Sequence, residues 1–163
     1  MYHIDNVTVS EDQLNQLLEQ REEKKSGKPA IKNLYFYVND SNQIHSEFWD
    51  NDGTDLYRLS QGNCFWGPNA EAECEKYQKY LEAFGAIRTY KSEKGMGGKV
   101  NWLNTEGKKY HIHFRTDLDQ FGVSGAYAHN DLSIFGSFKS EEQAEQLIRD
   151  CEKELRVVAN YVR

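Results

Sequence analysis

The stretch "GNCFWGPNAEAECEKYQKYLEAF" spans residues 62–84, and a weaker echo, "GSFKSEEQAEQLIRDCEKELRVV", spans residues 136–158. In the first stretch, apolar residues recur at spacings of four and three, which places them on one face of a helix. These residues are Ala70, Cys74, Tyr77, Leu81 and Phe84. A shift of 74 positions gives Ala144, Ile148, Cys151, Leu155 and Val158. Each stretch therefore predicts a strand, a glycine turn and an amphipathic helix.

Strand patterns surround these two units. "NLYFYVND" (33–40) and "IHSEFWD" (44–50) alternate in polarity about the turn "SNQ", so they predict a hairpin, and "LYRLSQ" (56–61) is predicted as a third antiparallel strand. Further strands are predicted at "VNWLN" (100–104), "KKYHIHFRT" (108–116), "FGVSG" (121–125) and "DLSIF" (131–135). Ser10 and Gln13 form a capping-box pattern before a leucine stripe, which predicts an N-terminal helix.

Together these patterns predict an α+β fold, with antiparallel sheets and helices packed on one face. The 163 residues, 38% of them hydrophobic, fit a single domain. Within it we expect an N-terminal helical segment (1–28), a first β-β-β-α unit (33–90) and a second β-rich unit closed by a helix (99–163).

The composition limits the cellular setting. No signal peptide or run of eighteen apolar residues is evident, so we expect a soluble protein of the cytosol. Cys64, Cys74 and Cys151 form neither an even disulfide set nor a C-x-x-C metal motif, so we expect them to be reduced and mostly buried.

The charge is unevenly distributed. Residues 88–115 hold seven Lys or Arg against two Glu, a balance of +5, while the whole chain carries −6. The remainder therefore carries −11. Aromatic residues are interleaved with these cations, a pattern typical of nucleic-acid or nucleotide binding. The alternative is that the cations pair with acidic helices of the same molecule.

Candidate metal and phosphate motifs are weak. His111 and His113 stand on one face of a predicted strand and would need a third ligand, such as Asp117, Asp119 or His129. The same alternation is typical of a solvated strand face, so we predict no metal. "DNDGTD" (50–55) lacks the Gly and Glu positions of an EF-hand loop, and "GMGG" (95–98) lacks the Walker pattern. We therefore read the first as a polar turn between strands, and we expect no cofactor.

The order of "YFYVNDSNQIHSEFWDNDGTDLYRLSQGNCF", "YHIHF" and "FKSEEQAEQLI" resembles a largely uncharacterised family of small accessory proteins of bacteriophages and prophages in Gram-positive bacteria. The resemblance covers residues 33–161. The first helix start, "WGPNAEAE", departs from the Thr or Ser cap usual in that family. The resemblance implies a non-enzymatic binding protein that inhibits a defence system, such as CRISPR or restriction, in the host bacterial cytoplasm.

The partner-binding residues are expected where the two units differ, in the turn "NCFWGPN" and in the basic segment. They are Trp66, Asn69, Tyr90, Lys91, Lys94, Lys99, Trp102, Lys108 and Lys109. A host protein is the expected partner, and nucleic acid is the alternative. The acidic helices mix both signs of charge, which favours a shape-specific protein interface over mimicry of nucleic acid. The oligomeric state is left open.

Overall fold

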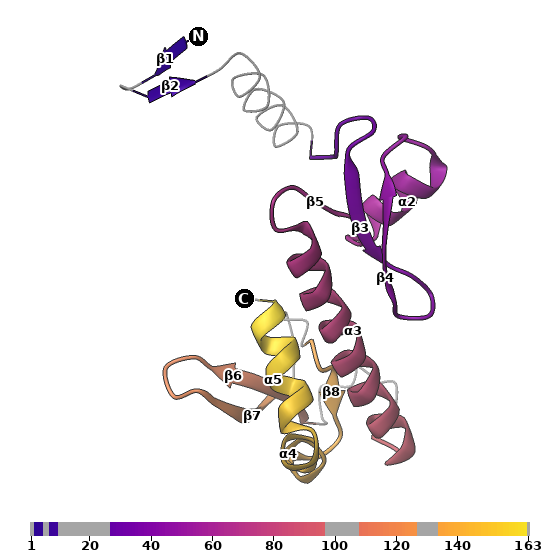
Figure 1. Cartoon of the computed structure of the whole chain (residues 1–163). Coiled ribbons are helices and arrows are strands. Elements are labelled where there is room, and N and C mark those ends of the chain that lie inside the picture. Colours follow the sequence, from indigo (N-terminus) through magenta and orange to yellow (C-terminus); the bar gives the residue numbers. More distant parts are fainter. Residues whose placement is uncertain (1, 5–6, 10–26, 97–107, 127–133, 163) are drawn as a thin grey trace. The chain divides into compact units, whose positions relative to one another are not determined.

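The structure is a computed structural model that describes residues 2–4, 7–9, 27–96, 108–126 and 134–162 (Figure 1). The chain divides into two compact units, which we call unit 1 (Met1–Gln78) and unit 2 (Lys79–Arg163). The predicted N-terminal helix and the predicted strand 100–104 lie outside the described residues. Two short strands that were not predicted, β1 (Tyr2–Ile4) and β2 (Val7–Val9), pair antiparallel. The expectation of a single domain stays a prediction.

Unit 1 contains the predicted hairpin. Strands β3 (Leu34–Val38) and β4 (Ile44–Phe48) pair antiparallel, and β5 (Phe65–Trp66) pairs with the other side of β3. The Asn39 side chain accepts hydrogen bonds from the backbone N–H of Ser41 and of Gln43, which closes the turn locally. The hairpin is therefore specified by residues close together in the sequence.

The predicted strand at 56–61 is wrong, because this segment belongs to helix α2 (Gly53–Ser60). Asp52 caps the helix: its side chain accepts a hydrogen bond from the backbone N–H of Asp55 at 2.8 Å. This cap satisfies one of the free N–H groups of the first turn. The stretch "DNDGTD" therefore starts a helix and is not a turn between strands.

The core of unit 1 is small and aromatic. Tyr35 and Trp49 are completely buried, and their rings meet edge to face at 5.7 Å between centroids. Cys64 completes the buried cluster. Tyr35 also contacts α2 through Asp55, so α2 covers the face of the sheet on which Tyr35 lies.

Unit 2 repeats a three-stranded antiparallel sheet. Its strands are β6 (Lys109–Arg115), β7 (Gln120–Ala126) and β8 (Ser137–Phe138), in the order β7-β6-β8. The predicted strands at 108–116 and 121–125 are confirmed. The predicted strand at 131–135 is not, because Ile134 and Phe135 lie in a turn before β8 and residues 131–133 lie outside the described residues.

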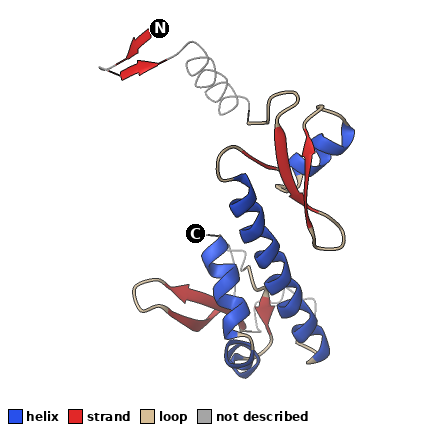
Figure 2. Cartoon of the chain, viewed as in Figure 1, coloured by secondary structure: helices blue, strands red, loops and turns tan. Residues whose placement is uncertain are grey.

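The helices of unit 2 lie against one face of its sheet. Ile112 and Phe138 are buried in one cluster with residues of the helices α3 (Ala70–Glu93), α4 (Glu141–Asp150) and α5 (Glu152–Tyr161) (Figure 2). The α+β fold with antiparallel sheets is thus confirmed. None of the described helices is long and apolar enough to cross a membrane.

The repeated helix face is confirmed for the second unit with one correction. Ala144, Cys151, Leu155 and Val158 are buried, as the echo predicted, and Ile148 is partly buried. The predicted single closing helix is instead two, because Cys151 has φ −127° and ψ 26° and ends α4 before α5 begins.

Helix α3 serves both units with different faces. Ala70 and Cys74 are buried in the first part of the helix, as predicted. Further along, Ala83 and Ile87 are the buried positions, whereas Leu81 is only partly buried. A single apolar stripe from 70 to 84 therefore does not describe the helix.

The two units share a topology that explains the sequence echo. In each, the first strand of a hairpin also pairs with a short third strand, and a helix follows. Strands β6, β7 and β8 and helix α4 begin 75, 76, 72 and 71 residues after β3, β4, β5 and α3. Gly62 and Gly136 both have positive φ, 68° and 74°. The echo thus marks corresponding turns in a repeated scaffold.

Two glycine substitutions should have opposite effects on stability. Gly62→Ala should lower the free energy of unfolding by about 1 kcal/mol, because only glycine adopts a positive φ without strain. Gly85→Ala should raise it by up to about 1 kcal/mol, because Gly85 lies inside α3 with open space at its Cβ position. Urea denaturation measures both, and equal signs would contradict the assignment.

Candidate functional site

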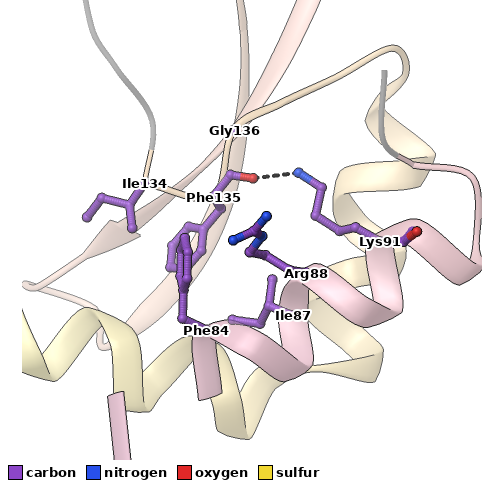
Figure 3. Close-up of a pocket in the computed structure, with 8 residues that line it drawn as sticks. Phe84, Ile87, Arg88, Lys91, Ile134, Phe135 and Gly136 are labelled. Atoms are coloured by element: carbon purple, nitrogen blue, oxygen red, sulfur yellow. Dashed lines mark hydrogen bonds between the residues drawn. The ribbon is translucent and has the colours of Figure 1, made fainter. Parts of the chain in front are cut away.

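A hollow in the surface of unit 2 is the candidate binding site (Figure 3). Its volume is about 470 Å³, within the range of small-molecule sites. One wall comes from α3 and the other from the turn before β8. Phe84, Ile87, Ile134 and Phe135 form the apolar part of the lining, and Arg88 and Lys91 supply positive charge.

The wall on α3 follows from helical spacing. Phe84, Arg88 and Lys91 are separated by four and three residues, so they lie on one side of the helix. Ile87 is 2% exposed and Phe135 is 7% exposed, and both belong to the core cluster of unit 2. The floor of the hollow is therefore part of the packed core.

Lys91 is held in place by the opposite wall. Its Nζ donates a hydrogen bond to the Phe135 carbonyl oxygen at 2.6 Å and lies 4.3 Å from the centroid of the Phe138 ring. Partial burial lowers the pKa of Lys91 below its usual value, because a charged ammonium loses hydration there. Gly136 leaves room for this contact, since a Cβ added there would come within 3.2 Å of the ammonium nitrogen.

Arg88 is an exposed cation of the hollow. Figure 3 shows its guanidinium pointing into the space between the Phe135 ring and the Lys91 ammonium. None of the ion pairs found among the described residues involves Arg88. A guanidinium beside aromatic rings can form paired hydrogen bonds to a carboxylate or a phosphate, while the rings contact an apolar group of the ligand.

A second polar cluster lies in unit 1. The Tyr35 hydroxyl donates to Asp55 Oδ1 at 2.7 Å, and Asp55 Oδ2 accepts from the backbone N–H of Asp50 at 2.8 Å. Arg58 Nη1 lies 2.5 Å from both the Tyr35 hydroxyl and Glu47 Oε2. Because these side chains bind one another, the cluster joins α2 to the sheet and does not point at an open site.

Burial and hydrogen bonds shift the pKa values in this cluster. Burial and the hydrogen bond to Asp55 raise the pKa of Tyr35 above its usual value, despite the opposing effect of Arg58. Burial alone would raise the pKa of Asp55. The hydrogen bonds that its carboxylate accepts from Tyr35 and from backbone N–H groups outweigh burial, so the pKa of Asp55 is lowered.

The three cysteines are free and buried, as the sequence predicted. Burial raises the pKa of Cys64 to about 12 and that of Cys74 to about 11, and it also raises the pKa of Cys151. Such thiols are poor nucleophiles at neutral pH, because the thiolate is the reactive form.

The predicted partner-binding residues are spread over both units. Trp66, half-buried in β5, and exposed Asn69 belong to unit 1. Tyr90, Lys91 and Lys94 share the last turns of α3 in unit 2. Lys99 and Trp102 lie outside the described residues. The expectation of one binding surface that contains all nine residues stays a prediction.

Several of these residues already have partners. The Tyr90 hydroxyl donates to the Asp150 carboxylate, which raises the pKa of Tyr90 to about 12. Lys108 lies 5.3 Å from the centroid of the Tyr110 ring. Lys109 is only 5% exposed, so its side chain offers little surface to a partner.

The weak metal candidates lie on the same strand, β6. His113 is exposed and packs against Gly122 of β7, where an added Cβ would come within 2.7 Å of its Nε2 atom. Two of the possible third ligands bind arginines: Asp117 pairs with Arg115 and Asp119 with Arg156. No group of three potential ligands that could hold a metal occurs among the described residues.

Sequence reasoning did not single out the hollow. Arg88 was noted only as the first cation of the basic segment, and residues 134–135 were predicted to form a strand. The spacing of Phe84, Arg88 and Lys91 is a usable signal for one wall. The other wall lies more than 40 residues further along the chain, and no local pattern indicates that the two meet.

Comparison with protein-family models, with curated proteins and with solved structures finds no match in any of the three.

Proposed function

We propose that this chain is a phage-encoded binding protein that inhibits a bacterial defence system, such as a CRISPR or restriction nuclease, in the host cytoplasm. On this proposal it acts by occupying a surface of its target and catalyses no reaction. The resemblance to phage accessory proteins supports the origin, and the hollow of unit 2 supports binding.

The observation that carries the proposal is the position of Arg88 beside buried aromatic residues. Arginine and aromatic side chains are enriched among the residues that dominate the affinity of protein interfaces. The hollow offers an exposed guanidinium, a fixed ammonium and an apolar floor. An acidic side chain of the target, flanked by an apolar one, is the group that this arrangement fits.

Reversing the charge of Arg88 should weaken target binding. We expect Arg88→Glu to lower the affinity for the captured target at least about tenfold, because a carboxylate would then face the acidic group of the partner. The experiment is affinity capture from a bacterial host, followed by an inhibition assay on the captured nuclease with wild-type and variant protein.

Arg149→Glu is the matched control. Arg149 is an exposed arginine of α4 in the same unit, does not line the hollow, and lies 3.6 Å from Glu145. Equal loss of binding in both variants would show that the effect is due to net charge. Failure to capture any specific partner would contradict the proposal itself.

The second candidate is nucleotide or single-strand nucleic-acid binding, favoured by the same geometry. Phe84 and Phe135 offer aromatic faces for a base, and Arg88 lies where it could contact a phosphate. A salt titration with a fluorescent single-stranded oligonucleotide tests it, because log K should fall with log salt by about 0.7 for each phosphate contacted. Weak binding that does not depend on salt would exclude this candidate.

A further inference from the structure

Strand β4 forms one edge of the unit 1 sheet. The order β4-β3-β5 gives β4 a strand neighbour on one side only among the described residues. Four of its five residues are exposed, and Ile44 is partly buried. Phe48 is 61% exposed although it is a large apolar side chain. An exposed edge strand carries unpaired backbone groups that can pair with another strand.

The hydrogen bonds beside the hairpin identify which backbone groups face outward. The N–H of Trp49 donates to the Asn33 oxygen and that of Asn39 donates to the Gln43 oxygen, each at 2.9 Å. Bonded and non-bonded pairs alternate along an antiparallel ladder, so 45 and 47 are bonded to β3. The N–H and C=O groups of residues 44, 46 and 48 therefore point to the open edge.

The sequence of this strand, "IHSEF", is complementary to itself when it is reversed about Ser46. In an antiparallel pair centred there, Ile44 lies opposite Phe48 of a second copy, and His45 lies opposite Glu47. The first contact is apolar, and the second joins an imidazole to a carboxylate. Both contacts occur twice because the pair has two-fold symmetry.

The backbone register agrees with the side-chain register. The outward-facing groups of residues 44, 46 and 48 would form the bonded pairs across the two-fold axis. His45 and Glu47 would then occupy non-bonded pairs, in which facing side chains approach more closely. Arg58 binds the Glu47 carboxylate at 2.5 Å, which fixes the carboxylate before a second strand arrives.

We propose that β4 pairs antiparallel with β4 of a second copy of this chain, centred on Ser46, so that two three-stranded sheets join into one of six strands. A second copy is the occupant that this edge fits, because it supplies apolar and charged side chains at the required positions at once. This inference goes beyond the proposed function and does not depend on the hollow in unit 2.

Sedimentation equilibrium of the full chain over a range of concentrations tests the association. Wild type should form a dimer. His45→Glu should raise the dimer dissociation constant at least tenfold, because it places two carboxylates opposite each other at two positions. His45→Lys should retain the dimer, since it keeps a cationic donor opposite Glu47. Circular dichroism should show the same fold in both variants, because residue 45 is exposed.

A cross-link tests the register. In the proposed pair, the two Ser46 Cα atoms would be about 5.5 Å apart, within the range of a disulfide. Ser46→Cys should therefore form a covalent dimer under mild oxidation, whereas Ser60→Cys, at an exposed residue of α2, should not. A monomeric wild type, equal association of the Glu and Lys variants, or equal cross-linking at 46 and 60 would overturn the proposal.

Discussion

Asp55→Ala is expected to lower the free energy of unfolding of unit 1 by about 3 kcal/mol. The Asp55 side chain is 3% exposed and accepts hydrogen bonds from the Tyr35 hydroxyl and from two backbone N–H groups. Removing it leaves buried donors without their acceptor and removes the link between α2 and the sheet. Urea denaturation followed by the fluorescence of Trp49, which contacts Tyr35, measures the loss.

Two variants separate the contributions within this cluster. Tyr35→Phe removes one hydrogen bond and keeps the packed ring, so we expect a loss of about 1 kcal/mol. Asp52→Ala removes the helix cap but leaves Asp55 in place, and we also expect about 1 kcal/mol. If Asp55→Ala costs no more than either variant, Asp55 is not the centre of the cluster.

The same residue should make stability depend on pH in the acid range. The pKa of Asp55 is lowered in the folded protein, so its contribution is fully present above the unfolded pKa of about 3.9. It is lost as the pH falls through the lower folded pKa, because the proton then binds in both states. The stability difference between wild type and Asp55→Asn should therefore shrink below about pH 4.

Local patterns predicted the hairpins and missed α2 for a physical reason. The turn at Asn39 and the alternation of β3 involve neighbouring residues, so both can be read from the sequence. The fate of Asp55 depends on Tyr35, twenty residues away, which takes its carboxylate into the core. Without that contact, "DNDGTD" has only the composition of a turn.

The candidate site shows the same limit. The 74-residue echo correctly indicated a repeated scaffold, because glycine turns and buried helix faces leave local signals. Arg88 meets Phe135 only through tertiary packing, which no spacing rule reports. The change of buried face along α3 was missed because the helix belongs to two units, and each unit requires its own apolar residues.

Leu155→Ala is expected to lower the free energy of unfolding by about 2–5 kcal/mol. Leu155 is completely buried in α5, in the same cluster as Ile87 of α3 and Phe138 of β8. Truncation removes its transfer free energy and leaves a cavity among three elements that cannot all collapse into it. Lys153→Ala, at an exposed position of the same helix, should change stability by less than about 0.5 kcal/mol.

The Leu155 variant also tests whether the chain is one domain. Trp49 and Trp66 lie in unit 1, so a Trp102→Phe background confines tryptophan fluorescence to that unit. A single domain unfolds in one step, because melting unit 2 removes the packing of Ala83 and Ile87 and so weakens the helix that unit 1 also uses. We therefore expect Leu155→Ala to lower the urea midpoint reported by Trp49 and Trp66 as much as the midpoint reported by helical circular dichroism. An unshifted fluorescence transition would instead show two domains that unfold independently, with α3 melting in two steps.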